Sequence, residues 1–155
     1  MRSVRDCVLK DGVGGGVIRS AEEFIALCES DNLDEQRRAS LEPASLEVWT
    51  EIVERYPDAR VWVVYNKTIP LEILRVLASD PDSAVRSAVA MKRKLTPDIL
   101  EGMAADSDES VRLQVARHRR TPRSVLERLL ADDWSEVRKL ARDRIENDDR
   151  SASSG

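Results

Sequence analysis

The segment Leu77-Ala-Ser-Asp-Pro-Asp-Ser-Ala-Val85-Arg86 decides the fold, because two later segments repeat its pattern. The later copies read Met103-Ala-Ala-Asp-Ser-Asp-Glu-Ser-Val111-Arg112 and Leu129-Leu-Ala-Asp-Asp-Trp-Ser-Glu-Val137-Arg138. Their Val-Arg pairs recur every 26 residues. A weaker upstream copy, Tyr56-Pro-Asp-Ala-Arg-Val61-Trp62, places its Val-Trp pair 24 residues before the first Val-Arg pair. A fixed period of this length predicts a chain built from structural repeats.

Prolines mark the start of each predicted repeat, because proline is well tolerated at the first position of a helix. Spacings of 27, 27 and 25 residues separate Pro43, Pro70, Pro97 and Pro122. The threonines before the last two prolines, Thr96 and Thr121, are suitable N-cap residues. Apolar residues at helical spacing follow each proline, and an acidic turn and a second apolar stripe come next. The sequence therefore predicts an all-α fold, a short α-solenoid of about four to five helical pairs.

Three segments are predicted along the chain. Residues 1–19 form a flexible, Gly-rich N-terminal arm, or alternatively a hairpin between Val8-Leu9 and Val17-Ile18. Residues 20–148 form the helical-repeat domain, in which 20–42 are a divergent N-terminal cap and 43–148 hold the repeats. The cap begins with a capping box, because Ser20 is followed three residues later by Glu23. Residues 149–155 are predicted to be a disordered tail.

The composition limits the class of protein. Charged residues make up 35% of the 155-residue chain, and no stretch approaches the roughly 18 apolar residues that span a bilayer. Residues 1–10 do not have the pattern of a signal peptide, and the two cysteines, Cys7 and Cys28, are expected to be reduced thiols. We therefore expect a cytoplasmic protein with no membrane segment and no metal. An excess of Arg over Lys, 20 against 5, favours a bacterial source.

The best-defined repeat contains Thr96-Pro97, Ile99-Leu100, Met103-Ala104, Asp106, Val111-Arg112 and Val115-Ala116. This pattern resembles the leucine-rich repeat variant, a HEAT-like helical repeat, over residues 43–145 and most strongly over 68–142. The resemblance implies a right-handed stack of helical pairs that serves as a binding surface. Some proteins of that family also resemble iron–sulfur proteins through an N-terminal cysteine cluster. Cys7 and Cys28 cannot supply the four thiolates of such a cluster, so no cofactor is expected.

The sequence offers little for catalysis. The only histidine, His118, lies among arginines and is expected to be an exposed loop residue rather than a general base. The glycine run within residues 12–16 lacks the Lys-Ser/Thr of a phosphate-binding loop. Acidic pairs such as Asp80 and Asp82 recur with the repeat, which indicates capping rather than catalysis. We therefore predict that the protein is not an enzyme.

An arginine occupies the same place in three repeats, at Arg86, Arg112 and Arg138. Asp82 and Asp108 precede the first two by four residues, which is ion-pair spacing on a helix. The arginines are therefore interpreted as a ladder with the acids of the turns. A column that binds anions is the alternative.

A protein-binding module, either an adaptor or an inhibitor such as an immunity protein, is the leading hypothesis for function. The second helices of the repeats would line a concave face, and an acidic protein is the expected partner. Trp62 replaces the arginine in the weak copy, and Trp134 replaces the aspartate of the third turn. Trp and Arg are enriched in interface hot spots. The predicted partner-binding residues are Trp62, Asn66, Arg86, Arg112, Trp134, Arg138 and Arg142.

Binding of nucleic acid is the alternative function. Basic residues gather in the loops between repeats, and stacked repeats would align them into one ridge, which is similar to the surfaces of HEAT-like DNA-repair glycosylases. Solvated charge near helix C-termini, which the helix dipole favours, explains the same residues without a ligand. The residues of this predicted basic ridge are Lys67, Lys92, Arg93, Lys94, Arg117, Arg119 and Arg120.

Overall fold

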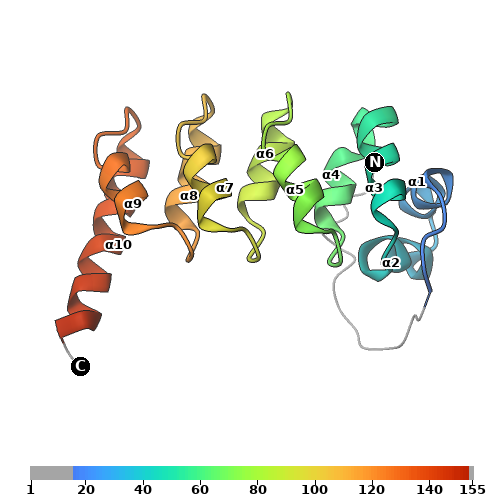
Figure 1. The fold of residues 1–155 in the computed structure, drawn as a ribbon, viewed down its shortest axis with the longest axis horizontal. Coiled ribbons are helices and arrows are strands. Elements are labelled where there is room, and N and C mark those ends of the chain that lie inside the picture. Colours follow the sequence, from blue (N-terminus) through green and yellow to red (C-terminus); the bar gives the residue numbers. More distant parts are fainter. Residues whose placement is uncertain (1–15, 154–155) are drawn as a thin grey trace. The chain divides into compact units, whose positions relative to one another are not determined.

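The structure is a computed structural model that describes residues 16–153 (Figure 1). These residues form ten α-helices and one 3-10 turn without any strand, which confirms the all-α class. Most of the predicted arm lies outside the described residues, together with Cys7 and the hairpin partner Val8-Leu9. The chain divides into two compact units, Met1–Leu77 and Ala78–Gly155.

The first unit has a small aromatic core. Its helices are α1 (Ala21–Glu29), α2 (Leu33–Leu41), α3 (Leu46–Arg55), the 3-10 turn η2 (Pro57–Ala59), α4 (Arg60–Tyr65) and α5 (Leu71–Leu77). The Ser20 hydroxyl accepts the Glu23 N–H at 3.1 Å, so the predicted cap of α1 is present. Phe24 and Trp49 are fully buried and pack edge to face, with ring centroids 5.2 Å apart.

Ordered structure begins before residue 20. Ile18 is only 1% exposed, and its N–H donates to the Pro43 carbonyl at 2.8 Å. An isolated parallel bridge joins Ile18 to Ala44. The predicted arm, which ends at residue 19, therefore includes a residue that belongs to the core of the first unit.

The second unit consists of helices that pack on their neighbours in regular order. They are α6 (Ser83–Ala90), α7 (Pro97–Met103), α8 (Glu109–Arg117), α9 (Arg123–Leu129) and α10 (Ser135–Ser153). Helix α8 packs against α6 and α7, and α10 packs against α8 and α9. Within this unit, the turns α7–α8 and α9–α10 lie at one end, and the loops α6–α7 and α8–α9 lie at the opposite end (Figure 1).

Burial follows the period of 26 residues. Val85, Val111 and Val137 are all buried, and Val89, Val115 and Ala141 repeat the pattern four residues later. In the first unit, the same spacing leads to Ala59 and Val63, which are also buried. Ala59, rather than Val61, therefore takes the place of the repeated valine. The predicted offset of 24 residues for the weak copy is wrong, and Arg60, rather than Trp62, stands at the arginine position.

Of the two predicted threonine caps, Thr96 occupies the N-cap position of α7 and Thr121 does not cap α9, and neither makes a side-chain cap bond. Thr96 precedes α7 but makes no side-chain cap bond, and its hydroxyl is buried without a partner among the described residues. The Thr121 hydroxyl donates instead to the Val115 carbonyl at 2.6 Å, and Pro122 takes the N-cap position of α9. The prolines are therefore not equivalent positions, which explains why their spacing varied while that of the buried residues did not.

Helix α10 is longer than the repeat requires. It has 19 residues and continues through Ser153, although the sequence predicted a disordered tail from residue 149. Two ion pairs contribute to its last turns. Arg123 of α9 pairs with Asp149, and Arg150 pairs with Glu146 four residues earlier.

Candidate functional site

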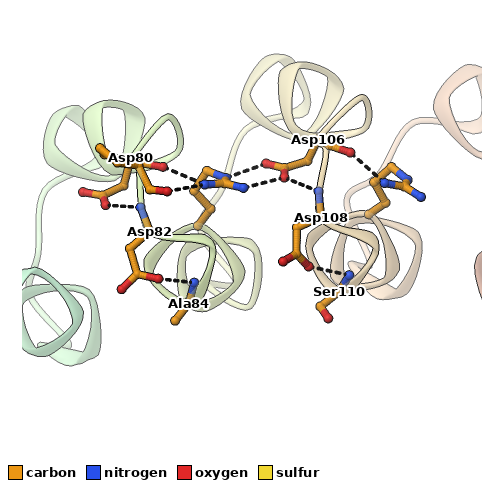
Figure 2. Close-up of polar contacts among 9 residues, drawn as sticks. Asp80, Asp82, Ala84, Asp106, Asp108 and Ser110 are labelled. Carbon is orange, nitrogen blue, oxygen red and sulfur yellow. Dashed lines mark hydrogen bonds and ion pairs between the residues drawn. The ribbon is translucent and has the colours of Figure 1, made fainter.

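The helix arginines of the second unit connect successive acidic turns. Arg86 at the start of α6 holds Asp106 of the next turn through two bonds, Nε to Oδ2 at 2.7 Å and Nη2 to Oδ1 at 2.8 Å (Figure 2). Its Nη1 donates to the Asp80 carbonyl of its own turn at 2.8 Å. Arg112 of α8 repeats the arrangement with Asp132, at 2.7 Å and 3.0 Å, and with the Asp106 carbonyl. We call these contacts the arginine ladder.

The predicted ion pairs at a spacing of four residues are wrong. Asp82 caps α6 by accepting the Ala84 N–H at 2.8 Å, and Asp108 caps α8 by accepting the Ser110 N–H at 2.8 Å (Figure 2). These carboxylates are turned toward the helix N–H groups that need partners. The acid that pairs with each arginine is instead the first aspartate of the following turn, 20 residues ahead.

The pKa values of the ladder acids reflect these contacts. For Asp106, burial alone would raise the pKa, but the hydrogen bonds from Arg86 and from the Asp108 N–H outweigh it, so the pKa is lowered. The pKa of Asp132 is lowered chiefly by the hydrogen bond from Arg112. Only 8% of the Asp106 side chain and 5% of the Asp132 side chain are exposed. Both acids are therefore ionised structural groups and are not open for catalysis.

Arg138 of α10 occupies the third position of the ladder but pairs with no acid within residues 16–153. Its Nη1 donates to the Asp132 carbonyl at 2.7 Å and to the Asp133 carbonyl at 2.9 Å, as Arg86 does in its own turn. Among the described residues, nothing bonds to its Nε or Nη2 atoms. The four predicted partner-binding arginines therefore fall into two groups. Arg86 and Arg112 are engaged by acids, whereas Arg138 and Arg142 form no ion pair with a described residue.

Asn66, which was expected on the concave binding face, does not lie on the surface. Asn66 is completely buried, and its Nδ2 donates to the Ala39 and Glu42 carbonyls at 2.7 Å and 3.0 Å. Its Oδ1 accepts the N–H of Thr68 at 2.8 Å. Asn66 therefore joins segments of the first unit, and its predicted placement on a binding face is wrong.

His118 is also buried, contrary to the expectation of an exposed loop residue. Its Nε2 lies 3.1 Å from the Lys92 carbonyl, and its Nδ1 accepts the Arg120 N–H at 3.1 Å. The imidazole therefore donates through Nε2 and is neutral, and burial, followed by the nearby arginines, lowers its pKa. Because both ring nitrogens are used, His118 cannot act as a general base for a substrate.

His118 fixes two basic loops side by side in the second unit. Its bond to Lys92 links the α8–α9 loop to the α6–α7 loop, and Arg120 adds a long contact of 3.5 Å to the Leu95 carbonyl. Arg144 of α10 donates to the Ala116 and His118 carbonyls at 2.9 Å and 2.7 Å. The sequence pattern did not single out Arg144, although it lies 26 residues after His118.

The basic ridge is only partly available for binding. Arg93, Arg117 and Arg119 are exposed and form no hydrogen bond or ion pair with a described residue. Lys92 and Lys94 are half-buried. The structure thus brings six of the seven predicted ridge residues, including Arg120, to two adjoining loops of the second unit or, for Arg117, to the helix end beside them. The seventh residue, Lys67, is exposed in the first unit.

The remaining predicted partner-binding residues lie on two elements. Trp62 is a half-buried residue of α4 in the first unit. Trp134 is half-buried directly before α10, and Arg142 is exposed on α10, one helical turn after Arg138. A joint concave surface of Trp62 with the ladder arginines stays a prediction.

The structure shows one recess that the sequence did not indicate. A cavity of about 390 Å³ lies between the α7–α8 and α9–α10 turns. It is lined by Ala104, Ala105, Leu129 and Ala131 and by charged groups that include Arg128 and Glu101. These two side chains are exposed and pair at 3.3 Å. The recess forms between turns that are about one repeat apart, so no local pattern pointed to it.

Residues 16–153 contain no group of three or more His, Cys, Asp or Glu side chains arranged to hold a metal ion. No helix in this part of the chain is long and apolar enough to cross a bilayer. Comparisons of the chain with protein-family models, with curated proteins and with solved structures give no match.

Proposed function

We propose that this chain is a non-enzymatic protein-binding module, an adaptor or an inhibitor, whose 26-residue helical pairs form a short right-handed α-solenoid of the leucine-rich repeat variant type. Its partner is a protein with an acidic surface. The burial of equivalent residues every 26 positions supports the solenoid, because each helical pair needs its neighbour to cover its apolar face.

One observation carries the binding function. Arg138, Lys139 and Arg142 lie within four residues of one another on α10, next to half-buried Trp134, and none of the three cations forms an ion pair with a described residue. We call the three cations together with Trp134, which directly precedes α10, the α10 basic face. The second unit has 15 basic and 15 acidic residues, so these unpaired cations do not come from a general excess of positive charge. They remain because the turn acids bind Arg86, Arg112 and helix N–H groups instead.

An aromatic residue beside unpaired arginines suits an interface with an acidic protein. Tryptophan and arginine dominate binding hot spots, where apolar contact surrounds a few strong polar bonds. Arginine is also the residue best matched to carboxylates, because its planar fork can donate two parallel hydrogen bonds.

A second candidate function, binding to the backbone of a nucleic-acid duplex, is supported by the two joined basic loops. Arg93, Arg117 and Arg119 are exposed and unpaired there, and His118 holds the loops together. The ridge contains no aromatic residue on which a base could stack, so single-stranded recognition is not favoured.

The two functions predict different variants to be defective. The partner is first captured with the full chain, and its affinity is then measured by calorimetry for the wild type, Trp134→Ala, Arg142→Ala and Arg119→Ala. The protein-binding function predicts a loss of tenfold or more for the first two variants, equivalent to about 1.4 kcal/mol. Loss for Arg119→Ala alone, with duplex affinity that falls steeply with salt, would instead establish the nucleic-acid function.

A further inference from the structure

Arg138 has the features of a preformed carboxylate site. At the three equivalent positions of the ladder, Nη1 is held by a carbonyl of the preceding turn, at 2.8 Å for Arg86 and 2.7 Å for Arg112 and Arg138. Arg138 has a second such bond, to Asp133 at 2.9 Å. These bonds fix the guanidinium before any ligand arrives, so little side-chain entropy is left to lose on binding.

The two internal copies show what this guanidinium binds. In Arg86 and Arg112, the edge formed by Nε and Nη2 takes both oxygens of one aspartate, at distances between 2.7 Å and 3.0 Å. Such two-point, charge-assisted bonds are strong and specific for a planar carboxylate. In Arg138, the same edge has no partner among the described residues.

We propose that the Nε–Nη2 edge of Arg138 binds an aspartate or glutamate side chain of an acidic partner protein, in the way that Asp106 and Asp132 bind inside the chain. This inference rests on the proposed protein-binding function and names its central contact. Half-buried Trp134, which precedes Arg138 by four residues, is the residue from which we expect apolar contact with the partner.

The residue at position 142 argues for a partner protein rather than for another helical pair packed in the same way. Ala90 and Ala116 occupy this position in the two preceding repeats, and both are almost completely buried, at 1% and 0% exposure. Arg142 is exposed, and covering it as its counterparts are covered would bury an unpaired charge. The first half of α10 therefore has an exposed cation where earlier repeats have a buried alanine, and beside it one arginine edge is ready for a carboxylate.

The test uses the full chain with ¹⁵N-labelled arginine and observes the Nε–Hε signals by NMR. The probe is an acetylated and amidated peptide, Ala-Ala-Asp-Ser-Ala, and the control peptide has Asn in place of Asp. We expect the Arg138 signal to shift with the Asp peptide, with affinity about tenfold higher than for the Asn peptide, because charged hydrogen bonds are lost in the control. The Arg86 and Arg112 signals should not move. An unmoved Arg138 signal would overturn the proposal.

Arg138→Lys is the decisive variant, because it keeps the positive charge but loses the two-point fork. It should bind the Asp peptide about tenfold more weakly, whereas Arg150→Lys, near the C-terminal end of α10 and outside the proposed site, should bind it nearly as well as the wild type. Equal binding by Arg138→Lys would show that only net charge matters and would overturn the carboxylate assignment. A shift of the Arg138 signal with protein concentration, in the absence of peptide, would assign the edge to a second copy and also overturn it.

Affinity measurements with a captured protein partner distinguish a failure of this inference from a failure of the proposed function. If such a partner binds the wild type and Arg138→Lys equally, but loses affinity for Trp134→Ala, the chain is still a protein-binding module and the Arg138 contact is wrong. If the Asp peptide shifts Arg138 but α10 variants bind the partner normally, the edge is a carboxylate site outside the interface, which also contradicts this inference.

Discussion

Arg112→Ala should be far more damaging than Arg138→Ala, although both arginines occupy the same place in the repeat. Arg112 makes two bonds to Asp132 and one to the Asp106 carbonyl. Its removal leaves the Asp132 carboxylate, whose side chain is 5% exposed, without its counterion. Breaking such a buried pair costs about 3–5 kcal/mol.

Removing Arg138 leaves no buried charge behind. The variant loses a part-buried bond to the Asp132 carbonyl and an exposed bond to the Asp133 carbonyl. A typical net contribution of such bonds is about 1 kcal/mol each, and both carbonyls can turn to water, so we expect a total cost of about 1–2 kcal/mol. The predicted difference between the variants is therefore about 2 kcal/mol or more.

Urea unfolding monitored by circular dichroism at pH 7 measures both costs. In thermal melts, each kcal/mol should correspond to about 2–4 °C for a chain of this size. As a control, Arg112→Ala combined with Asp132→Ala should cost less than the sum of the single variants, because the stranded charge is gone. Equal stability of the Arg112 and Arg138 variants would refute the ladder as a stabilising element.

The loss of stability caused by Arg112→Ala should depend on pH, and it should be smaller in acid. Because the folded-state pKa of Asp132 is lowered, its contribution to stability is present above the unfolded value of about 3.9 and is lost as pH falls through the lower folded value. In Arg112→Ala, protonation of Asp132 relieves the stranded charge. The gap between this variant and the wild type should therefore narrow below about pH 4.

Three further outcomes are expected. Because the folded-state pKa of His118 is lowered, the wild type should lose stability as pH falls below about 6.5. The variant His118→Asn offers the same donor and acceptor groups that Asn66 uses, so it should melt within a few degrees of the wild type at pH 7.5. It should not show the loss of stability below about pH 6.5. Val111→Asp should destabilise the protein far more than Ser87→Asp in urea unfolding, because Val111 is fully buried and Ser87 is half-buried; equal losses would contradict the inward face. Cys28 should react slowly with iodoacetamide at pH 8 until the chain unfolds, because burial raises its pKa to about 12.

The sequence was sufficient for the helices and the period but not for the partners of the arginines. A spacing of four residues favoured Asp82 as the partner of Arg86, because only contacts along one helix can be read from spacing. In the structure, Asp82 caps its helix, and Asp106 is brought to Arg86 by the packing of α6 against α8. A contact across 20 residues depends on how two helical pairs lie together, which no local rule contains.

The error over His118 has a different cause, because the necessary signal was present in the sequence. Charged neighbours suggested exposure, but His118 lies 26 residues from both Lys92 and Arg144, and 52 residues after Asn66. Asn66, His118 and Arg144 each bond to carbonyls of an earlier helix end or loop. Different residue types thus serve one role, which a search for identical residues overlooks.

The period of 26 residues in the sequence allows equivalent positions of one chain to be compared, and this comparison makes an unpaired group informative. An isolated exposed arginine needs no explanation, since most surface cations are simply solvated. Arg138 differs because its two equivalents, Arg86 and Arg112, each bind both oxygens of one aspartate carboxylate. They show which group the Nε–Nη2 edge of an arginine at this position binds. The substitution of exposed Arg142 for buried alanines shows that the first half of α10 departs from the internal pattern at one position while it retains the arginine at another. Retention of the arginine fork beside the exposed Arg142 is the observation behind our proposal that a carboxylate of a partner protein binds there.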